Sequence, residues 1–454
     1  MSHTLLHQKA LQNFKASLHG EVISPNDEGY ESARRVWNAM VDKHPALIVR
    51  CIDVSDVISA VQFARSQDLT VAVRAGGHDV SGHGVCDDGL VIDLAPMKGI
   101  HVDPKRRIAC AEPGLTSGEF LRETQKFGLA IPSGVFSSVG ISGLTLGGGI
   151  GWLSSRYGLT IDNLLSVEIV TADGSLLTAS ATEYPDLFWA VRGGGGNFGV
   201  VTALTFQLHL LARVLRGGAI HPMERSREVL RFYREYTRQC PDELTVNASL
   251  VTGPDSHPVV ILDACYCGDD LAEGERVLAP LRTFGPPIVD LIRPMSVLEN
   301  TTLLDFANPS GRYYFYHAES LPHLSDEVID TAIAFGSTCS SPLSAIVFYQ
   351  IHGTVMRVDP DATAFAQRHD YYILEMIAQW AEGEAQPHME WVHRFGAAIK
   401  PFASEGVYVN FLTEEGEARI RASYGLNYER LVQIKNRYDP TNFFHINQNI
   451  KPTR

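Results

Sequence analysis

Hydrophobic residues along the chain follow two different spacings. Residues 46–52 form a short apolar run, and residues 53–69 place apolar side chains at helical intervals after Asp53, a residue type that caps helices. Residues 200–208 alternate instead, which predicts a strand, and its shared face comprises Val200, Thr202, Leu204, Phe206 and Leu208. Further strand-and-turn segments lie at 70–79, 89–97, 101–114 and 166–180. This order of short strands and helices predicts an α+β fold.

The pattern changes near residue 210, where the glycine-rich turns stop. Longer segments with helical spacing then alternate with strands. The predicted helices are 226–239, 325–336 and 371–384, and the strands include 258–267 and 344–353. We interpret this part as a second domain, an antiparallel sheet with covering helices. The tail at 421–450 predicts a helix that ends in a Tyr-Asp-Pro turn, followed by a short segment rich in asparagine.

Composition narrows the class of protein. The 454 residues are 45% hydrophobic and 20% charged, an ordinary globular mixture that can bury a large core. The net charge of −14 argues against sequence-independent binding to nucleic acid or to anionic lipid. The first 20 residues are typical of a polar amphipathic helix and lack the apolar core of a signal peptide. No apolar run is long enough to predict a membrane span.

The seven cysteines are scattered, and only Cys265 and Cys267 lie close together. A zinc site would need more ligands at compatible spacing, so no metal site is predicted. We expect buried thiols in a reducing cytoplasm. The sequence also lacks a P-loop lysine motif, an H-E-x-x-H motif and a G-x-S-x-G elbow, so hydrolase and kinase functions have no support.

Glycine is unevenly distributed, with dense groups at 74–84, 132–151 and 193–199. In the first group, two adjacent glycines let backbone N–H groups point inward together, which suits a pyrophosphate. The same sequence pattern is also compatible with an ordinary β-turn that carries an exposed histidine. The second group is too rich in glycine for a stable helix and is apolar, which favours a packed binding loop over a flexible surface loop. The third contains G-x-G-x-x-G, but a helix-like segment precedes it and a strand follows, the reverse of a dinucleotide fingerprint.

Five segments, taken in order, resemble the FAD-linked oxidases of the vanillyl-alcohol oxidase superfamily, in their berberine-bridge-enzyme-like branch. The segments are RAGGHD (74–79), SVGISGLTLGGGIG (138–151), YGLTIDNL (157–164), DLFWAVRGGGGNFGVVT (186–202) and the ending at 424–450. The resemblance implies an α+β protein with a two-lobed PCMH-type FAD-binding domain at 1–208 and 415–454. It also implies a substrate-binding domain at 209–414, whose sheet lies over the isoalloxazine ring.

The resemblance implies how FAD is held. His78 stands where the family bonds a histidine to the flavin 8α-carbon, which retains the cofactor and makes it a stronger electron acceptor; His83 is the less favoured anchor. Phe136 replaces the cysteine that forms a second bond in many members, so a single covalent link is expected. Val139 matches a position where a small side chain admits O2, which favours an oxidase that forms H2O2. The other implied cofactor-binding residues are Arg74, Gly76, Gly77, Asp79, Ser81, Gly82, Gly140, Gly143, Gly148, Gly149, Gly151, Asn447 and Asn449.

The catalytic base is not given by the resemblance. Phe411 and Leu374 occupy two positions where relatives carry a base, and strand alternation is expected to turn the neighbouring Glu375 away from the pocket unless a bulge intervenes. The candidate bases are Tyr349, His352 and Tyr408, each with a purely structural alternative. Since an amine needs no strong base for hydride transfer, whereas an alcohol does, the missing bases favour amine-like substrates.

We therefore predict an FAD-dependent oxidase that transfers hydride from a small amine, alcohol or natural-product ring to covalently bound flavin. The alternatives are a sugar or secondary-alcohol oxidase, and a covalent flavoprotein that sequesters an aromatic compound. The expected partners are a small-molecule substrate and O2, without nucleic acid or membrane. The chain is expected to be a monomer or a homodimer.

Overall fold

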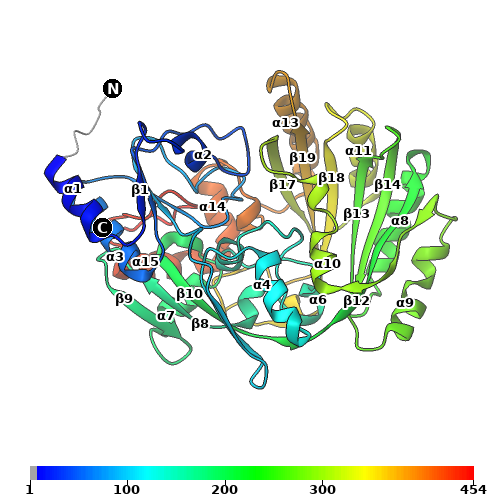
Figure 1. Cartoon of the computed structure of the whole chain (residues 1–454). Helices are drawn as coiled ribbons and strands as arrows, with labels where there is room; N and C mark the ends of the chain where they lie inside the picture. Colours follow the sequence, from blue (N-terminus) through cyan, green and yellow to red (C-terminus); the bar gives the residue numbers. More distant parts are fainter. Residues whose placement is uncertain (1–7, 454) are drawn as a thin grey trace.

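The computed structural model describes residues 8–453 and divides them between two lobes (Figure 1). The first lobe holds a four-stranded sheet in the order β1-β2-β4-β3 and a five-stranded sheet in the order β5-β6-β10-β8-β9. The strands of the first sheet are β1 (Glu21–Ile23), β2 (Leu47–Arg50), β3 (Val71–Arg74) and β4 (Leu90–Asp93). Those of the second are β5 (Ile100–Asp103), β6 (Ile108–Ala111), β8 (Leu164–Val170), β9 (Leu176–Ser180) and β10 (Val200–Gln207), while β7 (Leu129–Ala130) pairs with β11 (His209–Leu210).

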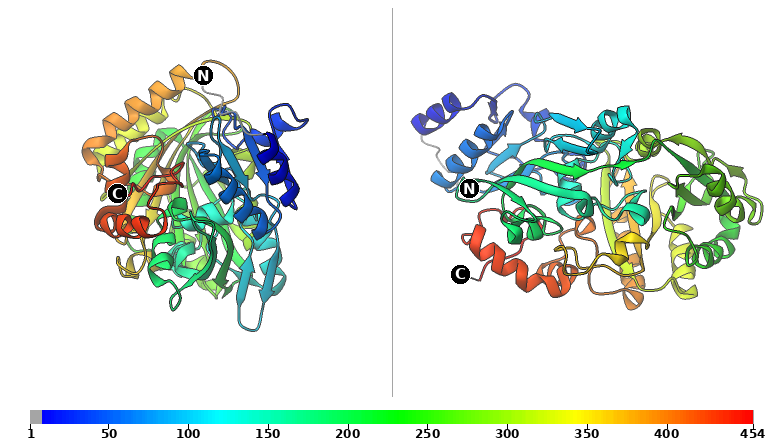
Figure 2. Two further views of the ribbon diagram at one scale, coloured as in Figure 1. Left: turned by 90° about the vertical axis from the view of Figure 1, so that its left-hand side faces the viewer. Right: turned by 90° about the horizontal axis from the view of Figure 1, so that it is seen from below.

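The helices of the first lobe are mostly short. They are α1 (Gln8–Ser17), α2 (Tyr30–Arg34), α3 (Val54–Ser66), α4 (Ser117–Thr124), α5 (Ile141–Leu146), α6 (Ser154–Tyr157) and α7 (Pro185–Val191). The C-terminal helices α14 (Glu417–Tyr424) and α15 (Tyr428–Tyr438) return to this lobe, as the red segment in Figure 2 shows. The Lys435 ammonium fixes this return, because it is fully buried and donates to Asp439 Oδ2 and to the backbone oxygens of Asn197 and Phe444.

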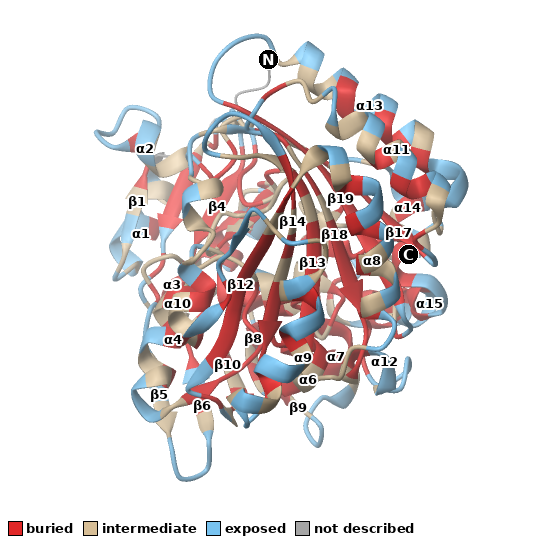
Figure 3. Ribbon diagram, turned by 90° about the vertical axis from the view of Figure 1, so that its right-hand side faces the viewer, coloured by how far each residue is buried: buried red, intermediate tan, exposed pale blue. Residues whose placement is uncertain are grey.

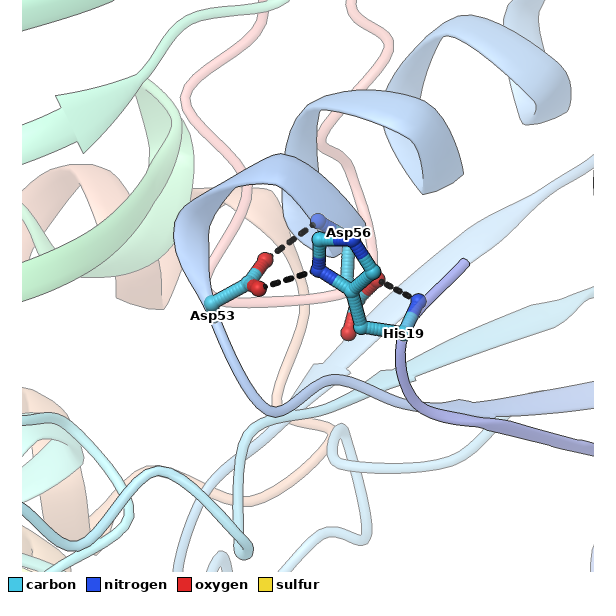
Figure 4. A group of neighbouring side chains, drawn as sticks. All are labelled: His19, Asp53 and Asp56. Atoms are coloured by element: carbon cyan, nitrogen blue, oxygen red, sulfur yellow. Dashed lines mark hydrogen bonds and ion pairs between the residues drawn. The ribbon is translucent and has the colours of Figure 1, made fainter. Parts of the chain in front are cut away.

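The start of α3 is fixed by a cluster of three polar side chains (Figure 4). Asp53 caps the helix by accepting from the Asp56 N–H at 3.1 Å, and its other oxygen lies 2.6 Å from His19 Nδ1. Asp56 accepts from the backbone N–H groups of His19, Gly20 and Ile52. Hydrogen bonds from Ser55 and His19 lower the pKa of Asp53 to about 2. The cluster therefore joins the chain before β1 to α3, as the predicted cap implies.

The second lobe is one antiparallel sheet in the order β15-β12-β14-β13-β18-β19-β17, with β16 paired to β12. Its strands are β12 (Arg213–Pro222), β13 (Leu244–Thr252), β14 (Pro258–Tyr266), β15 (Val289–Asp290), β16 (Arg293–Ser296), β17 (Tyr313–Leu321), β18 (Ala345–Ile351) and β19 (Tyr371–Trp380). Its helices are α8 (Ser226–Thr237), α9 (Leu271–Thr283), α10 (Val297–Thr302), α11 (Asp326–Gly336), α12 (Thr354–Arg357) and α13 (Gln386–Ile399). Helices α8, α9, α11 and α13 cover the outer face of the sheet, with exposed residues turned to solvent (Figure 3). The other face is turned toward the first lobe.

Two secondary-structure predictions are wrong. Residues 371–380 form strand β19 rather than a helix, and every one of them is buried. Leu374 and Met376 pack under the covering helices, while Tyr371 and Ile373 pack against the first lobe. A strand buried on both faces has no polar side, so its sequence cannot be told from a buried helix by spacing. The glycine-rich loop also contains a short helix, α5, despite Gly143 within it.

The mixed helix-and-sheet class, the strand at 200–207 and the antiparallel sheet after residue 210 are confirmed. The division at 209 and 415 stays a prediction. All seven cysteines are free thiols, but the expectation of burial is wrong for Cys110, which is exposed, while Cys240 and Cys339 are half-buried. Within residues 8–453, no helix combines the length and apolar character needed to cross a membrane.

Candidate active site

A cavity of about 1450 Å³ lies between the two lobes and is lined by both. This volume exceeds the 300–1,000 Å³ that is typical of a site for one small ligand. Its first wall, here called the glycine wall, consists of residues 74–80 and 134–147. The opposite wall, here called the sheet wall, consists of the cavity-facing side chains of strands β12–β14 and β17–β19. Ile288, Leu291 and Phe306 also line the cavity and are exposed, so the cavity meets solvent there.

The glycine wall is made where two loops touch backbone to backbone. A Cβ atom on Gly76 would lie 2.5 Å from the backbone nitrogen of Gly140, so neither loop tolerates a side chain at this contact. Gly77 has a φ of +65°, a left-handed conformation that favours glycine. Gly143 faces open space in the cavity, and Gly147 lies against the Asn410 side chain. Backbone atoms of this wall are therefore accessible to a ligand at close range.

His78 lies in the glycine wall and faces the cavity. Its ring stacks on Trp37, with the two ring centres 4.7 Å apart, and its Nε2 lies 2.8 Å from Ser138 Oγ. Removal from water lowers the pKa of His78 to about 4, so the imidazole is neutral at pH 7 and keeps a nitrogen lone pair. Trp37 in turn stacks on Tyr314 at 3.8 Å, which connects the histidine to the sheet wall.

The structure brings many of the predicted cofactor residues to this cavity. They are Arg74, Gly76, Gly77, His78, Asp79, Val139, Gly140, Gly143 and Asn447. The Arg74 guanidinium, however, is already engaged by Asp93 at 2.7 Å and by the backbone oxygen of Ala33 at 2.6 Å. The Arg74 guanidinium therefore mainly stabilises the turn rather than binding a ligand.

Other predicted residues lie beside the cavity rather than in its wall. They are Ser81, Gly82, Gly148, Gly149, Gly151 and Asn449. Ser81 donates its hydroxyl to the backbone oxygen of Leu412, and Gly82 packs on Val41. The Gly149 N–H donates to the Tyr408 hydroxyl oxygen at 2.9 Å. Ser81, Gly82 and Gly149 therefore shape the loops, whereas Asn449 Oδ1 is buried without a hydrogen-bond partner among residues 8–453.

The sheet wall carries a buried pair of titratable groups. The Tyr349 hydroxyl donates to Glu375 Oε2 at 2.8 Å, and both side chains line the cavity with exposures of 9% and 3%. Burial raises the pKa of Glu375 to about 7, although the hydrogen bond from Tyr349 acts to lower it. Burial also raises the pKa of Tyr349 well above its ordinary value, so this hydroxyl stays protonated and donates.

The expectation that Glu375 points away from the pocket is wrong. Strand β19 runs in continuous register with both β17 and β18, so no bulge intervenes. Leu374 is the residue that turns away, because its side chain packs in the core under the covering helices. Side chains do alternate along β19, but it is Glu375 that occupies the side facing the cavity. The sequence does not show that Glu375 faces the cavity, because every residue of β19 is buried and neither face of the strand is polar.

Two of the three candidate bases are engaged by hydrogen bonds to the backbone, although Tyr408 also lines the main cavity. His352 donates Nε2–H to the backbone oxygen of Leu244 at 3.0 Å and lies at a separate pocket of about 20 Å³, outside the main cavity. The Tyr408 oxygen accepts from the Gly149 N–H and from Asn410 Nδ2, and burial raises its pKa to about 12. Tyr408 therefore fixes the glycine-rich loop. A single 3-10 turn over Val409–Phe411 follows it.

The chain matches two family models. The model described as an FAD binding domain matches residues 45–180, and the model described as berberine and berberine like matches residues 407–451. An FAD-linked oxidoreductase of Dictyostelium discoideum is 33% identical, with 97% of each chain covered. The (R)-6-hydroxynicotine oxidase of Paenarthrobacter nicotinovorans is 30% identical, with 96% of this chain and 97% of that protein covered.

A solved structure shows the same arrangement of both lobes. The crystal structure of 6-hydroxy-D-nicotine oxidase from Arthrobacter nicotinovorans matches with a TM-score of 0.89 at 29% identity. The match covers 96% of this chain and 98% of that one. A berberine-bridge-enzyme-like protein of Physcomitrella patens, at 24% identity, shares the fold with a TM-score of 0.86. The similarity thus extends over both lobes and the C-terminal return.

Proposed function

The chain belongs to the berberine-bridge-enzyme-like family of FAD-linked oxidoreductases, and on that premise we propose that it oxidises a small amine, alcohol or natural-product ring in the cavity between the lobes. Bound FAD would supply the acceptor that takes hydride from the substrate carbon and passes the electrons to O2, giving H2O2. Val139, a small side chain in the glycine wall, supports the choice of O2 as the electron acceptor.

The residues of the cavity fit FAD. The glycine wall offers backbone at Gly76, Gly77 and Gly140, where a diphosphate can approach closely. Asn447 lines the same cavity, and its buried Oδ1 has no hydrogen-bond partner among residues 8–453. Buried polar atoms of this kind are normally paired, so this amide is available to the polar edge or the ribityl chain of a flavin.

We propose a single covalent link, from a ring nitrogen of His78 to the flavin 8α-carbon. The histidine faces the cavity and is neutral at pH 7, so a nitrogen lone pair is available for bonding. Ser138 and Trp37 hold the ring in place through Nε2 and through stacking. Phe136 lines the cavity where many relatives carry the second anchoring residue, and a benzyl side chain cannot form a thioether.

The observation that carries the proposed chemistry is the Tyr349–Glu375 pair in the sheet wall. A general base works best when its pKa lies near the working pH, and burial raises the pKa of Glu375 to about 7. We assign Glu375 as the base that removes the hydroxyl proton of an alcohol, or the surplus proton of an ammonium, as the substrate carbon loses hydride. Tyr349 holds the carboxylate through its hydroxyl. This assignment removes the reason to prefer amines, since an alcohol now has a base within the cavity.

The function is tested by mixing the oxidised holoenzyme anaerobically with panels of amines, alcohols and sugars while the yellow flavin absorbance is followed. Bleaching by amines or alcohols, followed by H2O2 release on admission of O2, is the expected result. Turnover of sugars alone would contradict the proposal. Reoxidation by O2 no faster than that of free flavin would contradict its oxidase part.

The role of Glu375 is tested with Glu375→Gln, which keeps the shape of the side chain but cannot accept the proton. We expect flavin reduction to slow by about 10²- to 10⁴-fold. Glu382→Gln, at an exposed position just beyond the end of β19, is the matched control and should reduce at the wild-type rate. Equal rates for the wild type and Glu375→Gln would exclude this carboxylate as the base.

A further inference from the structure

A second tyrosine stands beside Glu375 in the sheet wall, and the proposed chemistry does not use it. Tyr316 on β17 lines the cavity and is only 8% exposed. In the register of β17 with β19, Ala318 is opposite Glu375, and Tyr316 is two positions before Ala318. Tyr316 is therefore a diagonal neighbour of Glu375 on the same face of the sheet, a separation that long and aromatic side chains can span.

Two tyrosines thus flank the carboxylate, one from each strand that neighbours β19. Tyr349 on β18 is opposite Ile373, two positions before Glu375. Tyr316 on β17 is opposite Ile377, two positions after Glu375. The protein engages only one carboxylate oxygen, Oε2, through the Tyr349 hydroxyl. The other oxygen, Oε1, therefore remains available to a group in the cavity.

The Tyr316 hydroxyl has no partner in the protein. It forms no hydrogen bond within residues 8–453, whereas the hydroxyl of the neighbouring Tyr314 donates to the backbone oxygen of Pro309. Burial, together with the nearby Glu375 carboxylate, raises the pKa of Tyr316 well above its ordinary value, so the hydroxyl stays protonated and can donate. A buried tyrosine hydroxyl normally has a hydrogen-bond partner, so we expect a ligand in the cavity to supply one here.

The ring of Tyr316 is held in place by other aromatic side chains. It packs with Trp37 and Ile377, and its ring centre lies 6.2 Å from that of Trp37. Trp37 also stacks on His78, so one indole ring contacts both the proposed anchor and Tyr316. Tyr316 is therefore connected to the glycine wall through Trp37, which fixes its position relative to His78.

We propose that Tyr316 donates a hydrogen bond to the reacting oxygen of an alcohol substrate, while Glu375 Oε1 accepts the hydroxyl proton of that oxygen. This proposal rests on the proposed function, because it takes Glu375 as the base. The O–H proton passes to Oε1, the carbon-bound hydrogen leaves with two electrons as hydride to FAD, and the C–O single bond becomes C=O. Tyr316 keeps its own proton throughout and stabilises the negative charge that develops on the oxygen as the proton leaves.

A hydroxyl group suits these two partners better than an amino group does. An alcohol oxygen has one proton and two lone pairs, so it can donate to Oε1 and accept from Tyr316 at the same time. A neutral amine has a single lone pair, which must be free to form the C=N bond as hydride leaves. A hydrogen bond from Tyr316 to that lone pair would oppose the reaction. The substrate class is therefore an alcohol, and Tyr316 determines this selectivity.

The test measures binding and flavin reduction separately, with alcohols and amines that share a carbon skeleton. The probes are benzyl alcohol with benzylamine, and cyclohexylmethanol with cyclohexylmethylamine. Dissociation constants are measured by calorimetry on anaerobically reduced holoenzyme, which cannot accept hydride from any of them. Reduction rates are measured by anaerobic mixing with the oxidised holoenzyme. We expect at least one alcohol to bind and to reduce the flavin, and no measurable binding of either alcohol would overturn the proposal.

Tyr316→Phe keeps the packed ring but removes the donor. It should weaken the binding of the alcohol about five-fold and slow flavin reduction by the alcohol about 10²-fold. The rate should fall more than the affinity, because the hydrogen bond is strongest when charge has developed on the oxygen. Binding and reduction by the matching amine should each change less than about three-fold. Equal losses for alcohol and amine would indicate a purely structural role and overturn the proposal, as would an unchanged affinity and rate for the alcohol.

Tyr314→Phe is the matched control. Tyr314 lies on the same face of β17, two residues from Tyr316, but its hydroxyl binds the backbone oxygen of Pro309 and the residue is not part of the cavity wall. This variant should keep the wild-type affinity and rate for the alcohol. Thermal unfolding and the visible flavin spectrum establish that both variants are folded and loaded.

The role of Tyr316 and the proposed function can fail separately. If amines bleach the flavin but the alcohols neither bind nor bleach it, the role of Tyr316 is wrong and the proposed function stands. If the alcohols bind with the expected dependence on Tyr316 but no compound bleaches the flavin, the proposed function fails and Tyr316 remains a binding residue for a hydroxyl group.

Discussion

The two walls of the cavity are built by different means. The glycine wall is shaped by backbone, since Gly76 and Gly140 touch without side chains, and its form depends on the absence of Cβ atoms. The sheet wall is shaped by side chains on a regular antiparallel frame, where Asn247, Tyr349 and Glu375 stand on neighbouring strands. A substitution in the first wall changes the path of the chain, whereas one in the second changes only the chemistry presented to the cavity.

This difference assigns separate tasks to the two walls. A backbone surface that tolerates no side chain at its central contact, Gly76 against Gly140, suits a ligand of constant shape, as a resident cofactor is. A pleated sheet accepts almost any residue at a cavity-facing position without moving its neighbours, so it can be adapted to a substrate. We therefore expect substitutions in the glycine wall to alter flavin retention and stability, and substitutions in the sheet wall to alter rate and selectivity.

The strongest test of this comparison is His78→Ala in the glycine wall. Since the proposed covalent link runs through this residue, the denatured and washed variant should retain no yellow colour, whereas the wild type should retain all of it. His83→Ala is the matched control, because His83 lies in the same loop and lines the same cavity. Absorbance of the precipitated protein near 450 nm decides the question. Covalent flavin retained in His78→Ala would contradict the assignment.

The next test concerns the pH dependence of flavin reduction, which the sheet wall should set. Burial raises the pKa of Glu375 to about 7, and the base must be ionised to accept a proton. The rate with saturating alcohol should therefore fall about tenfold for each pH unit below 7 and level off above it. Stopped-flow reduction between pH 5 and 9 measures this profile. A flat profile in the wild type would show that Glu375 does not titrate in the reaction.

The two walls also differ in how far the sequence predicts them. The glycine wall was found because dense glycine, a histidine after Gly77 and their order along the chain are local signals. In the sheet wall the sequence singles out only Tyr349 as a site residue, because the members of this wall come from strands that are adjacent only in the folded sheet. Asn247 and Asp263 are 16 positions apart and meet only through the register of β13 with β14.

A second reason lies in strand β19. Its ten residues are buried on both faces, so neither the helical nor the alternating pattern shows which side meets the cavity. The sequence also does not show which way Glu375 points. Because Leu374 packs in the core under the covering helices, the next residue, Glu375, faces the cavity. Similarly, residue type makes Tyr408 and His352 candidate bases, and the sequence does not show the hydrogen bonds that engage both side chains in the fold. The fold class and cofactor wall were thus predictable, whereas the reacting groups required tertiary structure.

A pair of glycine substitutions tests how rigid the glycine wall is. Gly76→Ala forces a Cβ atom against the Gly140 backbone, which should destabilise the protein by roughly 2 kcal/mol or more. Gly143→Ala meets no atom within 4 Å and lies inside helix α5, where alanine is favoured by about 1 kcal/mol. The melting temperatures of the two variants should therefore move in opposite directions. Equal shifts would show that the loop contact is not the rigid feature described above.

The smallest effect is expected for Tyr349→Phe, and it separates two roles for this tyrosine. The hydroxyl lowers the pKa of Glu375 by donating to it, so its removal should raise that pKa and move the pH profile upward by about one unit. The plateau rate at high pH should stay within a few-fold of the wild type, because the carboxylate remains. Tyr372→Phe, which removes a hydroxyl from the opposite face of the sheet, should leave the profile unchanged. A plateau reduced by 100-fold in Tyr349→Phe would instead show that Tyr349 itself removes the proton, and that Glu375 only positions it.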